Sequence, residues 1–308
     1  MALDLEVGVC SKNFRHSVNE DNYLVMRGKR SELCIEYLKF YDFANKVYPD
    51  SERARLASAG KERILFSHDS ELYLSIERLE LAMGPFFSEN RLFAVLDGVT
   101  GRFNPYSENR VYSFPEIATT IAVEELISRF KIGRTDMLQM LKEADLAIAK
   151  EVEEYKKMLG CKNFVSSSVA TFALVQPEKL TVAHFGDTSL FLMRENRLKQ
   201  VTERQELGAS PSVYLGHGAV EPVISEQELC RGDIIVLCSD GVTAPFTETG
   251  IERNAEGNLC LSSKIDIEAI QDMLRSENNC QKASEKLVCY SKLKGNGDDA
   301  TAVVIKYS

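Results

Sequence analysis

Four acidic segments, far apart in the sequence, hold the residues best suited to chemistry. Glu20 lies in an Asn-Glu-Asp loop, and Asp97 and Asp240 each follow an apolar run and precede a glycine. Asp298 comes just before the last apolar run of the chain. Carboxylates held close together repel one another, and burial adds to the cost, so such a group is most easily kept when divalent cations neutralise it. A set of oxygen ligands favours Mg²⁺ or Mn²⁺ over zinc.

The alternative interpretation is that these acids only end strands and cap turns. An Asp-Gly pair is most often a turn, because both residues adopt turn conformations readily. The glycines at 98 and 241 are compatible with either interpretation. In a metal centre, a residue without a side chain would let a carbonyl oxygen or a water approach closely. Spacing along the chain leaves both interpretations open.

The elements that must position the acids follow an order typical of an α+β fold. Amphipathic patterns predict helices at about 115–130, 135–158, 265–276 and 280–295. Apolar runs predict strands at 3–9, 22–26, 92–97, 169–175, 179–185, 188–193, 197–202, 234–239 and 300–307. This order lacks the strict alternation of strand and helix that is typical of a doubly wound sheet. It indicates antiparallel sheets with helices packed outside them.

Three local patterns give further predictions. Residues 31–48 place apolar side chains near one helical face, which predicts a helix, whereas 72–83 fits neither a helix nor a strand throughout. Gly186 and Asp187 separate two strand patterns and are predicted to form a hairpin turn. His184 lies in an apolar strand, so it is predicted to be a core histidine with satisfied hydrogen bonds.

Composition limits the classes of function. A length of 308 residues allows one large domain or two small ones. The net charge of −9 and the lack of a dense Lys/Arg run argue against nucleic-acid binding. No apolar run approaches 18 residues, so no membrane span is predicted. The eight cysteines form no C-x-x-C pair, which argues against a zinc ribbon or a redox motif. In a chain of this length without a signal-peptide pattern, free thiols in a reducing cytoplasm are expected.

The sequence resembles the metal-dependent serine/threonine protein phosphatases of the type-2C, or PPM, family. Six segments match in the family's order: NED at 19–21, LFAVLDGVTG at 92–101, SSSVATFALV at 166–175, LTVAHFGDTSLFLM at 180–193, DIIVLCSDG at 233–241 and DDATAVV at 298–304. The resemblance implies a single domain over 1–308 with an atypical insertion at about 27–91. It also implies a four-layer αββα sandwich of two antiparallel sheets flanked by helices.

The resemblance implies a role for each acid. Asp97 would bridge two metal ions, and the Gly98 carbonyl would bind the second of them. Asp240 and Asp298 would hold the first ion. Glu20 would hold the second ion through water. The implied cofactors are therefore two Mg²⁺ or Mn²⁺ ions.

The chain departs from the family pattern at four places. The position of the usual phosphate-gripping arginine holds His16, so Arg15, one residue earlier, is the candidate for that contact. Val99 replaces a histidine that many members use as a proton donor. Ala244 and Phe164 stand where acids would hold an optional third metal, so no tight third site is expected. The fourth departure is the length of the 27–91 segment, which is either a regulatory or docking element or a surface elaboration.

The implied function is Mg²⁺- or Mn²⁺-dependent hydrolysis of phosphoserine and phosphothreonine in proteins by a hydroxide that bridges the two ions. The expected partner is a phosphoprotein substrate, with no nucleic acid and no membrane. One alternative is a catalytically weak or inactive relative that binds partners, which Val99 and Ala244 favour. Another is a hydrolase of a small phosphorylated metabolite. The intact set of Asp97, Asp240 and Asp298 favours an active enzyme.

Overall fold

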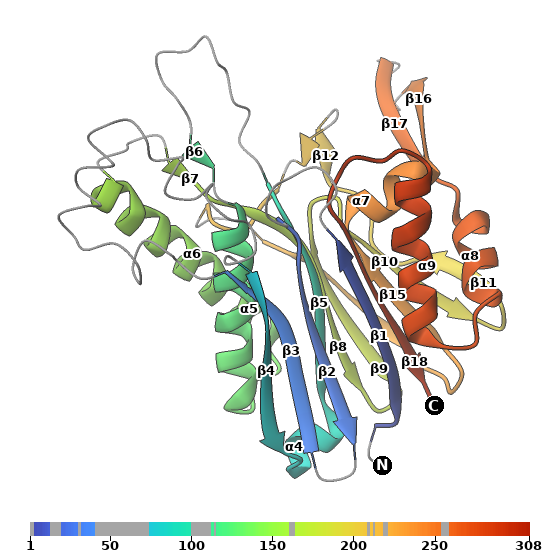
Figure 1. The fold of residues 1–308 in the computed structure, drawn as a ribbon, viewed down its shortest axis with the longest axis horizontal. Helices are drawn as coiled ribbons and strands as arrows, with labels where there is room; N and C mark the ends of the chain where they lie inside the picture. Colours follow the sequence, from blue (N-terminus) through green and yellow to red (C-terminus); the bar gives the residue numbers. More distant parts are fainter. Residues whose placement is uncertain are drawn as a thin grey trace.

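Two antiparallel sheets face each other in the structure, and helices cover their outer faces (Figure 1). The computed structural model describes residues 3–12, 20–29, 32–40, 74–99, 112–113, 115–159, 164–207, 210–211, 213–217, 221–253 and 259–308. The predicted four-layer αββα sandwich is confirmed.

The larger sheet has seven strands, and each neighbouring pair is antiparallel. In spatial order its strands are β14 (Val223–Glu228), β9 (Lys179–Phe185), β8 (Ser168–Gln176), β5 (Arg91–Gly98), β2 (Asn22–Lys29), β3 (Glu32–Phe40) and β4 (Leu74–Ala82). The described parts of the 27–91 segment thus extend this sheet at one edge.

The smaller sheet has five strands. In spatial order they are β1 (Leu5–Lys12), β18 (Ala300–Tyr307), β15 (Ile234–Cys238), β10 (Ser189–Arg194) and β11 (Arg197–Gln200). Three short pairs lie outside the two sheets: β6 (Tyr112–Ser113) with β7 (Phe164–Val165), β12 (Glu206–Leu207) with β13 (Ser210–Pro211), and β16 (Thr247–Arg253) with β17 (Leu259–Ile265).

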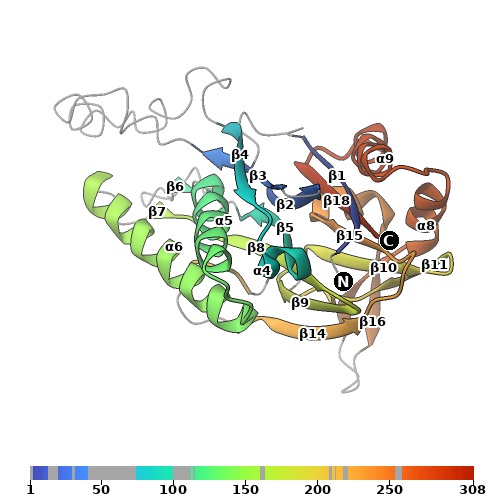
Figure 2. The ribbon, with the colours of Figure 1, turned by 90° about the horizontal axis from the view of Figure 1, so that it is seen from below.

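Helices form the two outer layers (Figure 2). The larger sheet is covered by α5 (Pro115–Lys131) and α6 (Met137–Leu159), and the smaller sheet by α8 (Ile267–Arg275) and α9 (Cys280–Leu293). Shorter helices are α4 (Pro85–Glu89), α7 (Asp240–Thr243) and a 3₁₀ turn at Ala244–Phe246. Gly295 lies just after α9 with φ +79°, a left-handed conformation that glycine adopts readily where a helix ends.

Three apolar layers hold the sandwich together. Side chains such as Phe93 on β5 and Leu237 on β15 fill the space between the two sheets. Phe172 on β8 packs with the helices of one outer layer, and Val304 on β18 packs with those of the other. Central strands such as β5 and β8 bury both of their faces, so their sequences are continuous apolar runs.

The predicted helix over residues 31–48 is wrong, because Glu32–Phe40 forms strand β3. Leu33, Ile35 and Tyr37 are all buried toward the α5 layer, while Leu38 faces the space between the sheets. Alternate residues therefore face opposite sides, as in a strand. Pairing of β3 with both β2 and β4 decides the conformation, and residues 41–48 lie outside the described part of the chain.

The hairpin predicted at Gly186 and Asp187 is also wrong. Strand β9 before it belongs to the larger sheet, and β10 after it belongs to the smaller sheet. The chain thus crosses between the two sheets at this point, and Gly186 has φ +80°. This crossover places Asp187 in the interior of the sandwich, where it is buried.

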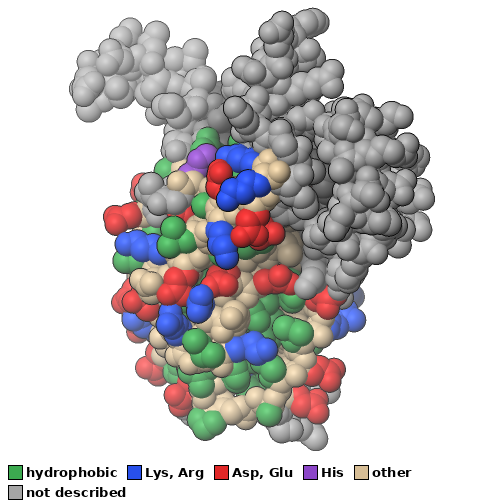
Figure 3. All heavy atoms as spheres, turned by 90° about the vertical axis from the view of Figure 1, so that its left-hand side faces the viewer, with side chains coloured by type: hydrophobic (Ala, Val, Ile, Leu, Met, Phe, Trp, Pro, Cys, Tyr) green, Lys and Arg blue, Asp and Glu red, His purple; other side chains and the backbone are tan. Residues whose placement is uncertain are grey.

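Figure 3 shows the face of the molecule toward α6 and β4, seen from the left of Figure 1. Among the described residues drawn there, basic and acidic side chains are interspersed, without a large area of one sign. Long-range steering of a strongly charged polymer needs such an area. Among the helices that the structure describes, none is long and apolar enough to cross a membrane.

Candidate functional site

The predicted acids come together because strand ends from both sheets meet at one edge of the sandwich. Asp97 is near the end of β5, and the start of β2 pairs with that end, Asn22 opposite Leu96. In the other sheet, Asp240 follows β15, and Asp298 precedes β18, which pairs with β15. Two antiparallel strand pairs, one in each sheet, thus place carboxylates from four distant segments at the same edge of the sandwich.

Asp97 is the electrostatic centre of this group. Burial raises the pKa of its carboxyl well above the usual range, and the charges of Asp21, Asp240 and Asp187 raise it further. The Asp97 carboxyl also shares a hydrogen bond with that of Asp240. These two predicted ligands are therefore direct neighbours, in surroundings that penalise negative charge.

Asp21 is a buried member of the group to which the sequence assigned no role. Burial raises its pKa, and repulsion from Asp299 adds to the increase. The Ser239 hydroxyl donates to the Asp21 carboxylate over 2.7 Å, and Thr301 hydrogen-bonds the same carboxylate. The signal for Asp21 was present in the Glu20-Asp21 pair, because strand β2 begins directly after it and fixes its direction.

Glu20 links the two sheets at the site. Its backbone N–H donates to a carboxylate oxygen of Asp299 over 2.9 Å. Its carbonyl oxygen lies only 2.9 Å from where a Cβ on Gly98 would stand. The loop that carries Glu20 therefore touches both the end of β5 and the start of β18.

Asn296 fastens the loop that carries Asp240 to the one that carries Asp298. Its side-chain amide donates to the Gly241 carbonyl over 2.6 Å, and its oxygen accepts the Asp298 N–H over 3.3 Å. Asp299 is buried and already accepts the N–H described above, whereas Asp298 is half-buried. Asp298 is therefore the more accessible of the two carboxylates.

The donor set fits a hard divalent cation, although the side chains as they stand do not form a finished metal site. No group of three His, Cys, Asp or Glu side chains converges on a metal position among the described residues. Asp97 and Asp240 nevertheless lie in contact and repel each other. A bound cation would remove that repulsion, and an oxygen-only set suits Mg²⁺ or Mn²⁺.

The remaining predicted positions fall into two groups. Arg15 and His16 lie outside the described residues, so the phosphate contact stays a prediction. Val99 is half-buried and its N–H donates to the Ser167 carbonyl over 2.9 Å. Ala244 is exposed in the 3₁₀ turn that follows α7. It offers no metal ligand from its side chain.

His184 is a satisfied core residue, as predicted. Its Nε2 lies 3.0 Å from the Glu203 carbonyl oxygen and must donate to it, so Nδ1 accepts from the Thr171 hydroxyl at 2.9 Å. Thr171 in turn lies 2.7 Å from the Thr188 hydroxyl. Burial lowers the pKa of His184 to about 4.

The lowered pKa of His184 predicts that the folded protein loses stability in mild acid. The unfolded chain takes up a proton near pH 6.5 and the folded chain only near pH 4, so stability is complete above pH 6.5 and declines between these values. The decline amounts to about 3 kcal/mol. Urea unfolding at pH 7.5 and pH 5 should show a smaller pH dependence in His184→Gln than in the wild type. The exposed His217→Gln serves as the control, and an equal pH dependence in all three proteins would contradict the assignment.

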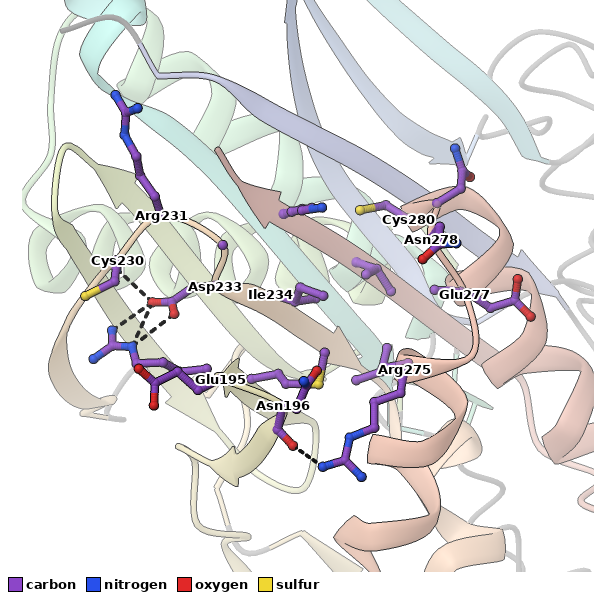
Figure 4. Close-up of a pocket in the computed structure, with 18 residues that line it drawn as sticks. Glu195, Asn196, Cys230, Arg231, Asp233, Ile234, Arg275, Glu277, Asn278 and Cys280 are labelled. Atoms are coloured by element: carbon purple, nitrogen blue, oxygen red, sulfur yellow. Dashed lines mark hydrogen bonds and ion pairs between the residues drawn. The ribbon is translucent and has the colours of Figure 1, made fainter.

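A cavity of about 480 Å³ lies at the other end of the smaller sheet (Figure 4). It adjoins the first residue of β15, whereas Asp240 follows the last. Its acidic side chains have strong partners: Asp233 accepts from Arg194 over 2.7 Å, and Glu277 pairs with Lys286 over 2.9 Å. The cavity is therefore separate from the acidic group, and two of its acids are paired with basic side chains.

Comparisons with known proteins agree with this architecture. The sequence profile of the family described as stage II sporulation protein E (SpoIIE) matches residues 113–308. No curated protein sequence matches the chain.

Solved structures share the fold over nearly the whole chain. PppA, a regulatory component of T6SS in Pseudomonas aeruginosa, has a TM-score of 0.57 and 14% identity, with 100% of both chains covered. The catalytic domain of the serine/threonine phosphatase PstP with two manganese ions has a TM-score of 0.57 and 17% identity over 98% of both chains. A serine/threonine phosphatase of S. agalactiae has a TM-score of 0.57 and 13% identity, covering 99% of this chain and 100% of its own.

Proposed function

Because this chain belongs to the SpoIIE family and has the type-2C (PPM) phosphatase fold, we propose that it hydrolyses phosphoserine and phosphothreonine in proteins with the aid of Mg²⁺ or Mn²⁺. The observation that carries the proposal is the contact between the half-buried Asp97 and Asp240 at the edge where both sheets end. Glu20, Gly98 and Asp298 adjoin that contact through the loops described above.

Each residue has a task that its position supports. Asp97 would bridge two ions, Asp240 and Asp298 would hold one of them, and Glu20 with the Gly98 carbonyl would hold the other. When bound, the ions would lower the pKa of a coordinated water toward neutrality and offset charge on the phosphoryl group. Partial burial of these acids reduces their contact with bulk water, which strengthens charge interactions inside the site.

The ion count and the compartment are parts of the same proposal. The PstP structure with two manganese ions and the lack of an acidic side chain at Ala244 support two ions without a tight third. Arg15 stays the candidate for binding the substrate phosphate. We expect the chain to form a single phosphatase domain. We also expect a reducing compartment such as the cytoplasm, because Cys238 and Cys280 are free, buried thiols whose pKa is raised by burial.

A metal titration tests the proposal. Mn²⁺ is added to metal-free protein, and phosphate release from an aryl phosphate and from a phosphothreonine peptide is measured alongside Mn²⁺ binding by calorimetry. Asp240→Asn should lose at least about 100-fold in activity and bind Mn²⁺ more weakly, since it removes a proposed ligand. Asp266→Asn, which alters the helix cap of α8 away from the site, should keep both properties.

The outcomes separate the proposal from its alternatives. Wild-type protein that binds Mn²⁺ but releases no phosphate from either compound would favour a phosphatase-like binding protein, to which Val99 and Ala244 also point. Turnover of phosphorylated metabolites without turnover of phosphopeptides would favour a small-molecule hydrolase. Wild-type protein that neither binds Mn²⁺ nor releases phosphate would refute the metal centre itself.

A further inference from the structure

A second polar site lies where the larger sheet extends beyond the smaller one. Strand β1 is the edge of the smaller sheet, while β3 and β4 continue the larger sheet past it. A cavity of about 380 Å³ lies at this step and is bounded by β1, β2, β3, β4 and the start of α9. We call it the overhang cavity.

Two arginines and one glutamate define the chemistry of the overhang cavity. Glu36 on β3 accepts from Arg27 of β2 over 3.1 Å and from Arg78 of β4 over 2.9 Å. The Tyr23 hydroxyl donates to the other oxygen of Glu36 over 3.0 Å. The three charged side chains come from three neighbouring strands, so the sheet itself sets their spacing.

The charge of this group is unbalanced. The Glu36 side chain is only 8% exposed, whereas those of Arg27 and Arg78 are 33% and 62% exposed. Burial alone would raise the pKa of Glu36, but the hydrogen bond from Arg78 and the charge of Arg27 outweigh it and lower the pKa. One carboxylate thus fixes two guanidinium groups, and among the described residues that line the cavity one positive charge remains in excess. The exposed Glu80, two residues after Arg78 on β4, lies on the same face of the sheet but outside that lining. Each guanidinium keeps N–H donors that Glu36 does not use.

A chain of hydrogen bonds runs from the overhang cavity to the acidic site. Ser11, which lines the cavity, lies 2.5 Å from the Thr301 hydroxyl, and Thr301 hydrogen-bonds Asp21. Tyr23 follows Asp21 by two residues on β2. Val25 on the same strand stands opposite Glu36, which places the arginine pair about 13 Å from Asp21 along the strand.

We propose that Arg27 and Arg78, held in place by Glu36, form an accessory site that binds an acidic side chain of the phosphoprotein substrate. The identity of the ligand rests on the proposed phosphatase function. The excess positive charge selects a carboxylate, and guanidinium groups bind carboxylates through paired N–H donors. About 13 Å corresponds to roughly four residues of extended peptide, so the acid stands about four positions from the phosphorylated residue.

In the cavity near Arg194 and Asp233, by contrast, the two ion pairs described above each join one acid to one basic side chain, so they show no carboxylate that holds two guanidinium groups. The proposed accessory site would also explain the presence of strands β3 and β4 in the 27–91 segment. They supply Glu36 and Arg78, and the edge position of β4 leaves Arg78 open to solvent.

The test compares two phosphothreonine peptides on each protein, one with aspartate four residues from the phosphothreonine on either side and one with alanine there. The wild type should prefer the acidic peptide by roughly three- to tenfold in kcat/KM, mainly through KM, and the preference should shrink in high salt. Arg78→Gln should bring the ratio close to one. Because the ratio compares two peptides on one enzyme, a general loss of activity cancels. Arg134→Gln, which removes an exposed arginine paired with Glu143, should leave the ratio unchanged.

A second variant gives a change of opposite sign. Glu36→Gln frees both guanidinium groups from their carboxylate, so the preference for the acidic peptide should increase. If the arginines only neutralise Glu36, neither variant alters the ratio, and that result overturns the proposal. A wild-type ratio of one also overturns it. Thermal melting confirms that each variant is folded; Arg78→Gln leaves Glu36 paired with Arg27.

A binding measurement keeps this proposal separate from the phosphatase assignment. Fluorescence anisotropy with labelled, unphosphorylated peptides in EDTA and low salt requires neither metal nor turnover. The wild type should bind the aspartate peptide at least threefold more tightly than Arg78→Gln does. If this difference is present while no phosphate is released, the accessory site stands and the catalytic function fails. If phosphate is released but the difference is absent, the accessory site is wrong.

Discussion

Asp97→Asn is expected to abolish metal-dependent phosphate release and, at the same time, to stabilise the metal-free protein. The Asp97 carboxyl is buried and lies against other acids, so without metal its charge opposes folding. Asparagine keeps the shape and removes the charge. With EDTA present, the free energy of unfolding should rise by about 0.5–2 kcal/mol. Activity should fall by at least about 1000-fold, because a bridging ligand worth several kcal/mol is lost.

Asp233→Asn is the matched control for this variant. Asp233 is more deeply buried than Asp97 but has good partners, since it accepts from Arg194 over 2.7 Å and from the Cys230 N–H over 2.8 Å. Its replacement should lower stability by about 1–3 kcal/mol and leave Mn²⁺-dependent activity in place. Urea unfolding in EDTA and phosphate release in Mn²⁺ give the two values for each protein. A destabilised Asp97→Asn with wild-type activity would show that Asp97 has a structural task only.

The acids were predictable because their signal is local. An apolar run that stops at an aspartate marks the end of a buried strand, and both Asp97 and Asp240 stand at such ends. Which strand ends meet is a matter of tertiary pairing, and the resemblance supplied that information. Asp21 received no ligand role because the same loop offered Glu20, and adjacent residues of an extended chain point in opposite directions.

Other features depended on contacts that no local pattern encodes. Residues 32–40 satisfy a helical and a strand pattern together, and pairing on both sides selects the strand. Strand β14 is exposed along most of its length, so it lacks an apolar pattern. The local pattern at Gly186 predicts a hairpin, because it contains no information on whether the two flanking strands belong to the same sheet, and here they belong to different sheets. The pairing of Glu36 with Arg78 spans 42 residues and could only be seen in the folded chain.

Gly241→Ala is expected to disrupt the site through the backbone alone. A Cβ at this position would stand 1.8 Å from the Asp299 carbonyl oxygen and 3.2 Å from the Ala300 Cα. The neighbouring atoms cannot yield easily, since Asp299 is held by the Glu20 N–H and the Gly241 carbonyl accepts from Asn296. Relief of the clash must push the loop of α7 away from the start of β18.

That separation moves the proposed ligand Asp240 away from Asp298, so Mn²⁺ affinity and activity should each fall by about 100-fold, with a loss of about 1–3 kcal/mol in stability from overpacking. Gly297→Ala tests the same loop without the clash: a Cβ there would have no atom within 4 Å, although it directly precedes Asp298. It should bind Mn²⁺ like the wild type in calorimetry. Equal Mn²⁺ affinity in both variants would mean that the two loops do not act on a shared metal, because only Gly241→Ala drives them apart.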